Sequence, residues 1–310
     1  TEPMIKDMVK ELNALLKCGV ISPETESEWC SACHMVRKPD GSWRLVCDDR
    51  YMNSQRVPWR GHPMKDRLQL ELFMGGVIAL GSADGTKAYW QCRIADECKK
   101  YHCLWTPVGK FRFNVLSMGD LNAAHRFTHA VEAIMKPFLY KSPAGTCQYM
   151  DDGLQYSREG HERHPLAKDG EDDAWYYLAE HWVKLLKHCL KNNYYVSPKK
   201  TYLFRDKLIF LGNELSRDGI RADPKRIQAL CDAPRPTRAD ELYAFCSIGR
   251  WMADKIPSYS SIEAPMREFI EKALAKSGKR TKSSVKKYTL DSLGWTHEDD
   301  GHFDALRDAI

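Results

Sequence analysis

The chain has 310 residues, of which 43% are hydrophobic and 29% are charged, as in globular proteins with room for several subdomains. It contains no apolar run of about 18 residues, so we expect no membrane-spanning helix, and its first residues show no signal-peptide pattern. The net charge of +5 is too small to indicate nucleic-acid binding by itself, so the distribution of charge carries more information.

The cysteines predict a reducing compartment. All 11 are scattered along the chain, and Cys30-Ser-Ala-Cys33 is the single CxxC pair, with no second pair to complete a zinc site. Abundant unpaired cysteine in an ordinary composition favours an intracellular protein. It does not decide between a cytoplasmic particle and the nucleus, and both places stay open.

The first elements are a helix and a hairpin. Apolar residues at helical spacing predict a helix over 4–17. Two β-prone runs about an Asp-Gly turn then predict a hairpin over 35–46 that carries Arg37, Lys38 and Arg44. Basic groups on an exposed hairpin suit a polyphosphate ligand, although ordinary surface charge is the favoured explanation for this segment alone.

Three aspartates stand at predicted strand ends. Asp84 ends one apolar strand, and Asp151 and Asp152 form the turn of a hairpin over 146–157. Adjacent carboxylates repel each other, and a bound divalent cation offsets that repulsion. An Asp-Asp-Gly tripeptide alone is more often a solvated turn. With the third acid, the pattern predicts a two-Mg²⁺ site for in-line phosphoryl transfer.

Two helices and a polar insertion surround this hairpin in the sequence. Apolar periodicity predicts helices over 122–138 and 177–192. The segment 161–176 is polar, acidic and rich in turn residues, which predicts a surface insertion. Its His161 and His164 lie near acidic residues, and a solvated loop is favoured over a metal site there.

The last third is predicted to be a strand followed by helices. A buried strand is expected over 207–215, and helices are expected over 224–232, 239–254 and 261–276. The segment 272–287 contains seven Lys or Arg residues and no acid, so it suits either a phosphate backbone or a solvated linker.

A series of short motifs follows one order along the chain. The motifs are Trp43-Arg44-Leu-Val, Asp48-Asp-Arg50-Tyr-Met-Asn53, Pro63-Met64, Asp84 to Gln91, Phe111-Arg-Phe113, Gly119 to Phe127, Tyr149-Met-Asp151-Asp152, Lys199-Lys200, Phe210-Leu211-Gly212, Asp223-Pro224-Lys225, Pro234-Arg-Pro236 and Phe303-Asp-Ala-Leu306. In this order they resemble the reverse transcriptases of gypsy-type (Metaviridae) long-terminal-repeat retrotransposons, which are related to the retroviral enzymes. The resemblance covers nearly the whole chain.

The resemblance implies an α+β right-hand polymerase fold with fingers, an antiparallel palm sheet and a helical thumb. The implied boundaries are 1–80 for the fingers and the start of the palm, 81–221 for the palm (with 92–118 in the fingers and the insertion at 161–176), 222–276 for the thumb, and 277–310 for a basic linker and the start of a connection region. The chain begins at Thr1 and stops before any ribonuclease H or integrase domain, so we expect a fragment of a longer polyprotein.

The resemblance also implies an activity, RNA-directed DNA synthesis. Such an enzyme extends a primer on an RNA or DNA template with deoxynucleoside triphosphates, using two Mg²⁺ ions that Mn²⁺ can replace. Ribonuclease H and integrase parts of a polyprotein are the implied partners. Two alternatives stay open: a catalytically silent binding or scaffold module with the same fold, and a metal-dependent nuclease, which would not need Tyr89, Lys38 or Arg44.

The implied site residues fall into four groups. The catalytic group is Asp84, Asp151, Asp152 and Lys200, with the three aspartates as metal ligands and the lysine as proton donor to pyrophosphate. The nucleotide-binding group is Lys38, Arg44, Gly85, Tyr89, Met118 and Gly119. The primer grip is Phe210, Leu211 and Gly212, and the nucleic-acid-binding group is Lys276, Lys279, Arg280, Lys282, Lys286 and Lys287.

Several positions depart from the pattern of the family. Ser117-Met118-Gly119-Asp120 stands where Pro-Phe-Gly-Leu is typical, and Ala124 stands where Pro is typical. Gly85 and Gly153 replace the usual hydrophobic residues after the catalytic aspartates. Glycine weakens a strand, so we expect a lower polymerisation rate or fidelity.

Overall fold

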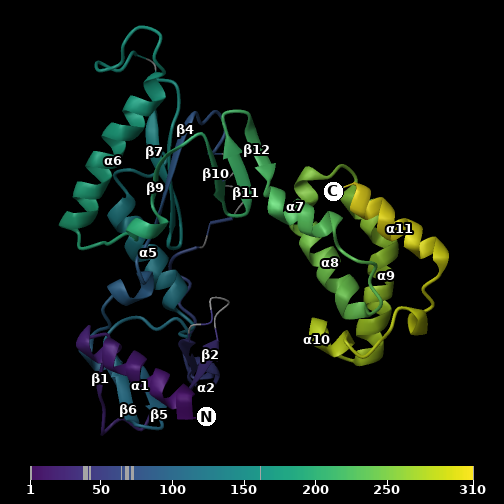
Figure 1. Ribbon diagram of the computed structural model, residues 1–310. Helices are drawn as coiled ribbons and strands as arrows, with labels where there is room; N and C mark the ends of the chain where they lie inside the picture. Colours follow the sequence, from purple (N-terminus) through teal and green to yellow (C-terminus); the bar gives the residue numbers. More distant parts are fainter. Residues whose placement is uncertain are drawn as a thin grey trace. The chain divides into compact units, whose positions relative to one another are not determined.

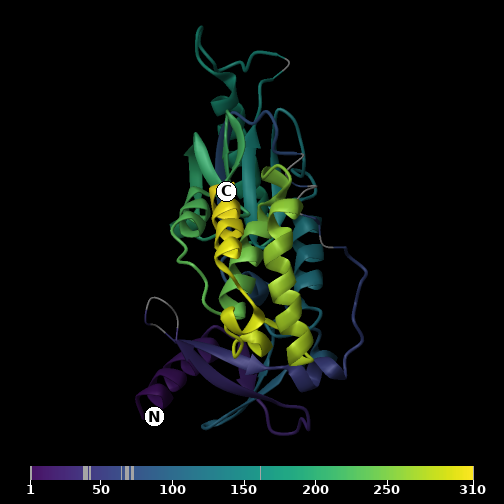
Figure 2. The ribbon, with the colours of Figure 1, turned by 90° about the vertical axis from the view of Figure 1, so that its right-hand side faces the viewer.

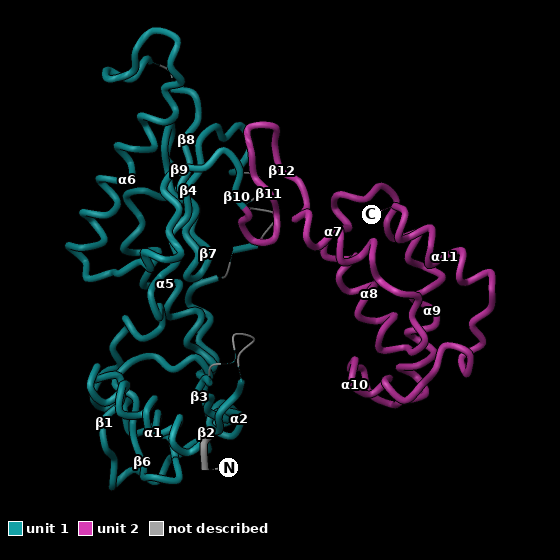
Figure 3. The backbone as a smooth tube through the Cα atoms, in the orientation of Figure 1, with its two compact units in different colours: residues 1–208 teal, residues 209–310 magenta. Residues whose placement is uncertain are grey.

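The computed structural model describes residues 2–37, 41, 43–63, 65, 66, 70, 73–160 and 162–309 (Figure 1). The chain divides into two compact units, Thr1–Leu208 and Ile209–Ile310, which are coloured separately in Figure 3. No helix in the described part of the chain is both long and apolar enough to cross a membrane.

The first unit contains two sheets and the helices that cover them. Its helices are α1 (Glu2–Lys17), α2 (Arg50–Ser54), α4 (Asp96–Lys99), α5 (Ala123–Met135) and α6 (Asp173–Lys191), with 3₁₀ turns η1 (Ala88–Gln91) and η2 (Pro198–Lys200). Its strands are β1 (Ile21–Pro23), β2 (Ser31–Arg37), β3 (Trp43–Asp48), β4 (Ala79–Asp84), β5 (Cys103–Thr106), β6 (Gly109–Phe113), β7 (Ala144–Tyr149), β8 (Asp152–Ser157) and β9 (Tyr202–Arg205).

A five-stranded sheet in the order β1-β6-β5-β2-β3 carries helix α1 on its apolar face. The predicted helix forms because Met8, Leu12 and Leu15 recur at helical spacing and therefore share one face. They pack in one core with Leu104 and Phe113. The predicted hairpin is β2–β3, although Lys38 at its turn lies outside the described residues.

The second sheet of this unit has the order β7-β8-β4-β9, and α6 lies along it (Figure 1). Leu178, Trp182 and Leu185 form the apolar stripe of α6 and pack in one core with Phe127 and Val131 of α5. The strands β4 and β8 are antiparallel neighbours: β4 ends at Asp84, and β8 begins at Asp152 directly opposite it. This sheet therefore positions the aspartates.

Helix α6 begins at Asp173, which is earlier than the predicted start at residue 177. Asp172 caps the helix, because its side chain accepts a hydrogen bond from the backbone amide of Ala174 at 3.1 Å. The insertion predicted over 161–176 therefore contributes its last residues to a helix.

His164 of the insertion packs against aromatic side chains. It is buried and stacks on Tyr176, at 5.5 Å between ring centroids, while Tyr177 meets it edge-on. His161 lies outside the described residues.

The second unit begins within β10 and is mostly helical. It contains β10 (Lys207–Phe210), β11 (Asn213–Ser216), β12 (Gly219–Ala222), α7 (Pro224–Cys231), α8 (Ala239–Trp251), α9 (Tyr259–Ser277), α10 (Lys282–Val285) and α11 (His297–Asp308), with 3₁₀ turns at Ala253–Lys255 and Asp291–Leu293. Figure 2 shows α9 and α11 side by side, and the two helices are in contact.

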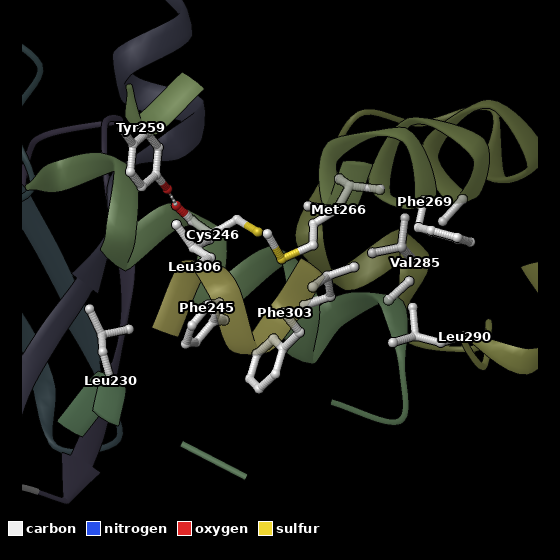
Figure 4. Packing of buried hydrophobic residues seen from close by; sticks show 14 of the residues in the cluster. Leu230, Phe245, Cys246, Tyr259, Met266, Phe269, Val285, Leu290, Phe303 and Leu306 are labelled. Atoms are coloured by element: carbon white, nitrogen blue, oxygen red, sulfur yellow. Dashed lines mark hydrogen bonds between the residues drawn. The ribbon is translucent and has the colours of Figure 1, made fainter. Parts of the chain in front are cut away.

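One apolar core joins the helices of this unit (Figure 4). Phe245, Met266 and Phe303 come from α8, α9 and α11 respectively, and all three are buried. The hydroxyl of Tyr259 donates to the carbonyl of Cys246 at 3.0 Å and so ties α9 to α8. Residues 277–310, which the sequence predicts to be a basic linker and the start of a connection region, contribute α10 and α11 to this core.

Candidate active site

Three aspartates meet where β4 ends and the β7–β8 hairpin turns. Asp84 is the last residue of β4 and lies opposite Asp152, the first residue of β8. Asp151 is in the turn, and its carbonyl accepts a hydrogen bond from the amide of Gly85 at 3.0 Å. Met150 adopts φ 52°, which makes the turn tight enough to bring the adjacent acids to one sheet edge.

The electrostatics of the cluster show an excess of negative charge. The pKa of Asp152 is raised above its usual value by partial burial and by the nearby Asp151 and Asp84 carboxylates. Lys200 opposes this effect, because its ammonium donates to Asp84 Oδ2 at 3.0 Å. The same hydrogen bond and charge raise the pKa of Lys200.

The segment before Lys200 runs along the end of β4. The amide of Ser197 donates to the carbonyl of Asp84 at 2.8 Å, and Val196 forms an isolated bridge with Gly85. The short turn η2 then presents Lys200 to Asp84. This arrangement joins residues 116 positions apart in the sequence.

Glycine at 85 has a steric explanation. A Cβ atom built at Gly85 would lie 2.5 Å from the hydroxyl oxygen of Tyr194 and 3.2 Å from Ala88 Cβ. Tyr194 is 5% exposed and belongs to the core beneath the site. Tyr194 therefore fills the space that the usual hydrophobic side chain would need.

Glycine at 153 has a similar explanation. A Cβ atom at Gly153 would lie 3.0 Å from Gln148 Oε1 and 3.1 Å from Gln155 Nε2. Gln148 in turn donates to the carbonyl of Met150 at 2.8 Å, which supports the turn that carries the acids.

A buried polar network lies under the hairpin, and sequence reasoning missed it. Thr146 Oγ1 donates to Gln155 Oε1 at 2.5 Å, and His181 Nε2 lies 3.1 Å from Thr146 Oγ1 and 3.0 Å from Gln155 Oε1. Burial lowers the pKa of His181 to about 4, so the ring is neutral at neutral pH. The available signal was the alternation that places polar residues at 146, 148 and 155 on one face of a buried hairpin.

Three of the predicted nucleotide-binding residues line a cavity of about 570 Å³ to which the three aspartates do not contribute. Arg44, Met118 and Gly119 line it together with Lys87 and Trp90. Lys38 lies outside the described residues.

Tyr89 belongs to the aspartate cluster. Its ring stacks on Phe127 at 4.9 Å between centroids, and its pKa is raised by burial and by the Asp151 carboxylate. Among the predicted nucleotide-binding residues that the structure describes, Tyr89 and Gly85 are thus the ones beside the acids.

The predicted primer-grip residues belong to the second unit. Phe210 is buried, and Leu211 (φ 48°) and Gly212 (φ 77°) form a tight turn between β10 and β11. A Cβ atom at Gly212 would lie 2.6 Å from the ring of Trp251, so glycine is required by packing and by backbone conformation.

The predicted nucleic-acid-binding residues also belong to the second unit. Arg280 makes two hydrogen bonds of 2.9 Å to Glu271, and Lys276 donates to the carbonyl of Ser292 at 3.4 Å. Lys287 lies over the ring of Tyr288, whereas Lys282 begins helix α10 at an exposed position.

The aspartate cluster suits a hard divalent cation by chemistry. Within the described ranges, no three His, Cys, Asp or Glu side chains are arranged as a ready-made metal site. The aspartates nevertheless supply the oxygen donors that Mg²⁺ prefers, and the raised pKa of Asp152 reports negative charge that a cation would offset. Asp84 is paired with Lys200, so it would have to exchange that ammonium for a metal ion.

Comparison with known proteins assigns the family. Residues 36–215, more than half of the chain, match the family described as reverse transcriptase (RNA-dependent DNA polymerase). The chain belongs to the reverse transcriptase family. The resemblance noted from the sequence motifs is therefore confirmed.

Curated relatives of this reverse transcriptase chain include transposon polyproteins. The retrovirus-related Pol polyprotein from transposon opus of Drosophila melanogaster is 25% identical over 294 residues, which cover 92% of this chain and 27% of that protein. The corresponding polyprotein from transposon gypsy is 25% identical and covers 86% of this chain and 24% of that protein. The enzymatic polyprotein of cauliflower mosaic virus (strain Strasbourg) is 26% identical and covers 83% and 36%. The chain thus spans about a quarter of the length of the two transposon relatives.

Solved structures confirm the predicted fold class. A foamy viral protease-reverse transcriptase dRH in complex with double-stranded DNA matches all of this chain and 48% of its own, with a TM-score of 0.79 and 21% identity. A foamy viral protease-reverse transcriptase in complex with an RNA/DNA hybrid matches with a TM-score of 0.77 and 20% identity, over all of this chain and 37% of its own. The α+β polymerase fold expected from the sequence is therefore present.

Proposed function

We propose that this chain is the polymerase part of an RNA-directed DNA polymerase, which extends a primer with deoxynucleoside triphosphates on an RNA or DNA template. The observation that carries the proposal is the meeting of Asp84, Asp151 and Asp152 at one sheet edge in a chain of the reverse transcriptase family. The solved relatives are complexes with DNA and with an RNA/DNA hybrid, which supports a primer–template as the partner.

The three aspartates would hold two Mg²⁺ ions, or Mn²⁺ in their place. When bound, these ions lower the pKa of the primer 3′-hydroxyl and neutralise charge on the leaving pyrophosphate. Asp84 and Asp151 would be the main metal ligands, and Asp152 would complete the acidic pocket. Lys200 would leave Asp84 and donate a proton to the departing pyrophosphate. The 3.0 Å distance between Lys200 Nζ and Asp84 Oδ2 supports this role.

The nucleotide would be held on the fingers side. Arg44 would bind the triphosphate as a planar fork and Lys38 as a point charge. The half-buried ring of Tyr89, fixed by its stacking on Phe127, would exclude a ribose 2′-hydroxyl by bulk. Met118 and Gly119 would pack against the incoming nucleotide and the template base.

The proposed domains follow the family pattern. They are fingers and the start of the palm at 1–80, palm at 81–221, thumb at 222–276 and a region leading onward at 277–310. Phe210, Leu211 and Gly212 would grip the primer, and the basic residues from Lys276 to Lys287 would contact the duplex backbone without sequence preference. Ribonuclease H and integrase parts of a polyprotein remain the proposed partners, and an intracellular particle or the nucleus remains the proposed place of action.

Primer extension tests the proposal. The assay would use an RNA template, a DNA primer, deoxynucleoside triphosphates and Mg²⁺, with Asp151→Asn beside the unaltered chain. We expect extension that Asp151→Asn abolishes and that Asp169→Asn, at an exposed position of the insertion, leaves unchanged. No extension by any of the three proteins, with Mn²⁺ also tried, would point to the silent binding module instead.

A further inference from the structure

A buried ion pair involves the segment 117–122, whose Met118 and Gly119 line the proposed nucleotide cavity. Arg56 is paired with Asp120, and their side chains are 15% and 5% exposed. Asp120 is the residue that stands where leucine is typical of the family. The pair is therefore a feature of this chain that the shared motifs do not explain.

The surroundings of the pair fix both partners. Arg56 also donates to the carbonyl of Tyr101 at 2.8 Å, and Asp120 Oδ1 accepts a hydrogen bond from the amide of Asn122 at 2.7 Å. His102 Nδ1 lies 3.8 Å from Asp120 Oδ2, but burial and the neighbouring Arg56 lower the pKa of His102 to about 4. The histidine is thus neutral at neutral pH, and Arg56 supplies the positive charge that Asp120 needs.

Other contacts attach the same segment to the residues around Arg56. The side-chain Nδ2 of Asn53 donates to the carbonyl of Gly119 at 2.9 Å, and its Oδ1 accepts from the backbone amide of Leu121 at 2.9 Å. Asn122 accepts from the amide of Trp59 at 2.7 Å. Asp120 is flanked by these hydrogen bonds, so a shift of Asp120 would move Gly119 as well.

We infer that the Arg56–Asp120 ion pair is a positioning device that holds the segment 117–122 in place for nucleotide binding. The inference rests on the proposed function, because it takes the cavity beside Met118 and Gly119 to be the nucleotide site. A buried pair behaves asymmetrically: loss of one partner leaves an uncompensated charge, whereas joint replacement by apolar residues removes both charges. Arg56 and Asp120 therefore act on nucleotide binding together, without touching the nucleotide.

A double-mutant cycle tests this role in primer extension. Asp120→Leu and Arg56→Met should each raise KM for deoxynucleoside triphosphates by about tenfold, equivalent to about 1.4 kcal/mol, with a smaller change in kcat. The double variant should return KM to within about twofold of the unaltered chain, because both charges are gone. Arg56→Lys should lie between the extremes, since lysine keeps the charge but loses the fork.

A matched control separates positioning from general stability. Glu132 pairs with Lys65 at 2.7 Å in the same unit, and both side chains are largely buried. Glu132→Gln should lower the melting temperature and leave KM unchanged. If the Arg56 and Asp120 single variants behave like Glu132→Gln, the pair is merely structural and the inference is wrong.

Hydrogen exchange gives a readout that does not require activity. Amides of residues 119–122 should exchange at least about tenfold faster in each single variant and recover in the double variant. Unchanged exchange and unchanged KM in an active enzyme would overturn the inference while the proposed function stands. A chain without polymerase activity would fail the proposed function, and the exchange cycle would still decide whether the pair positions the segment. If a single variant does not fold, Arg56→Lys and the double variant decide the matter by the same two measurements.

Discussion

Adding one methyl group beside Asp84 should destabilise the first unit, and a second substitution should restore its stability. Gly85→Ala would place Cβ 2.5 Å from the hydroxyl oxygen of Tyr194, which is 5% exposed and held in the core. Overpacking of this kind costs about 1–3 kcal/mol. The lower entropy of the unfolded alanine chain returns about 0.4–1 kcal/mol. We therefore expect a net loss of about 1–2 kcal/mol in the free energy of unfolding.

The compensating change is Tyr194→Phe, which removes the atom that clashes. The next neighbours of the added Cβ would be Ala88 Cβ at 3.2 Å and the ring carbon of residue 194 at 3.3 Å, which small shifts can relieve. In the Tyr194→Phe background, Gly85→Ala should therefore cost less than about 0.5 kcal/mol, which gives a coupling of at least about 0.5 kcal/mol.

Urea unfolding of the four proteins, followed by circular dichroism, measures this coupling. Primer extension on the same set reports whether the backbone beside Asp84 has moved. Gly301→Ala is the matched control, because a Cβ atom at that helical position of the second unit meets nothing within 4 Å, and it should stabilise by up to about 1 kcal/mol. If Gly85→Ala lowers the free energy of unfolding equally with Tyr or with Phe at position 194, the steric explanation of glycine at 85 is refuted.

Three further predictions concern charge. Asp152→Asn should stabilise the metal-free protein at neutral pH by less than about 1 kcal/mol, since Asp152 is only partly buried and water screens its charge. The raised pKa of Asp152 means that protonation relieves the same repulsion, so the gain should vanish in acid, as unfolding at two pH values would show. His181 has a pKa lowered from 6.5 to about 4, so the stability that its neutral ring contributes is complete above pH 6.5 and is lost as the pH falls toward 4. His181→Gln should therefore reduce the pH dependence of the unfolding free energy by on the order of 3 kcal/mol. An unchanged pH profile would count against the buried neutral ring. Lys282→Ala should reduce the slope of log affinity for duplex against log salt by about 0.9, whereas Arg280→Ala should change it less because Glu271 already pairs with Arg280; equal slopes would contradict the assignment.

Local elements followed closely from the sequence. The helix predicted over 224–232 is observed as Pro224–Cys231, because Asp223 caps it and proline suits the first turn. Helix α9 was predicted over 261–276 and is observed as Tyr259–Ser277. The start of α6 was predicted four residues late, since the cap at Asp172 lies inside a polar stretch that resembles a loop.

The sequence by itself was enough to identify the family and the fold class and to predict that the three aspartates lie at strand ends. These features depend on local turns, on residue spacing and on the order of motifs. Contacts between distant segments were decided by the tertiary structure alone. Lys200 bonds to Asp84, His181 packs under the β7–β8 hairpin, and Arg56 pairs with Asp120. Periodicity tells which face of an element is buried, but it does not tell which side chain of another element lies opposite. Those pairings arise only when the sheets and helices pack, because packing sets the distances on which each hydrogen bond and each charge interaction depends.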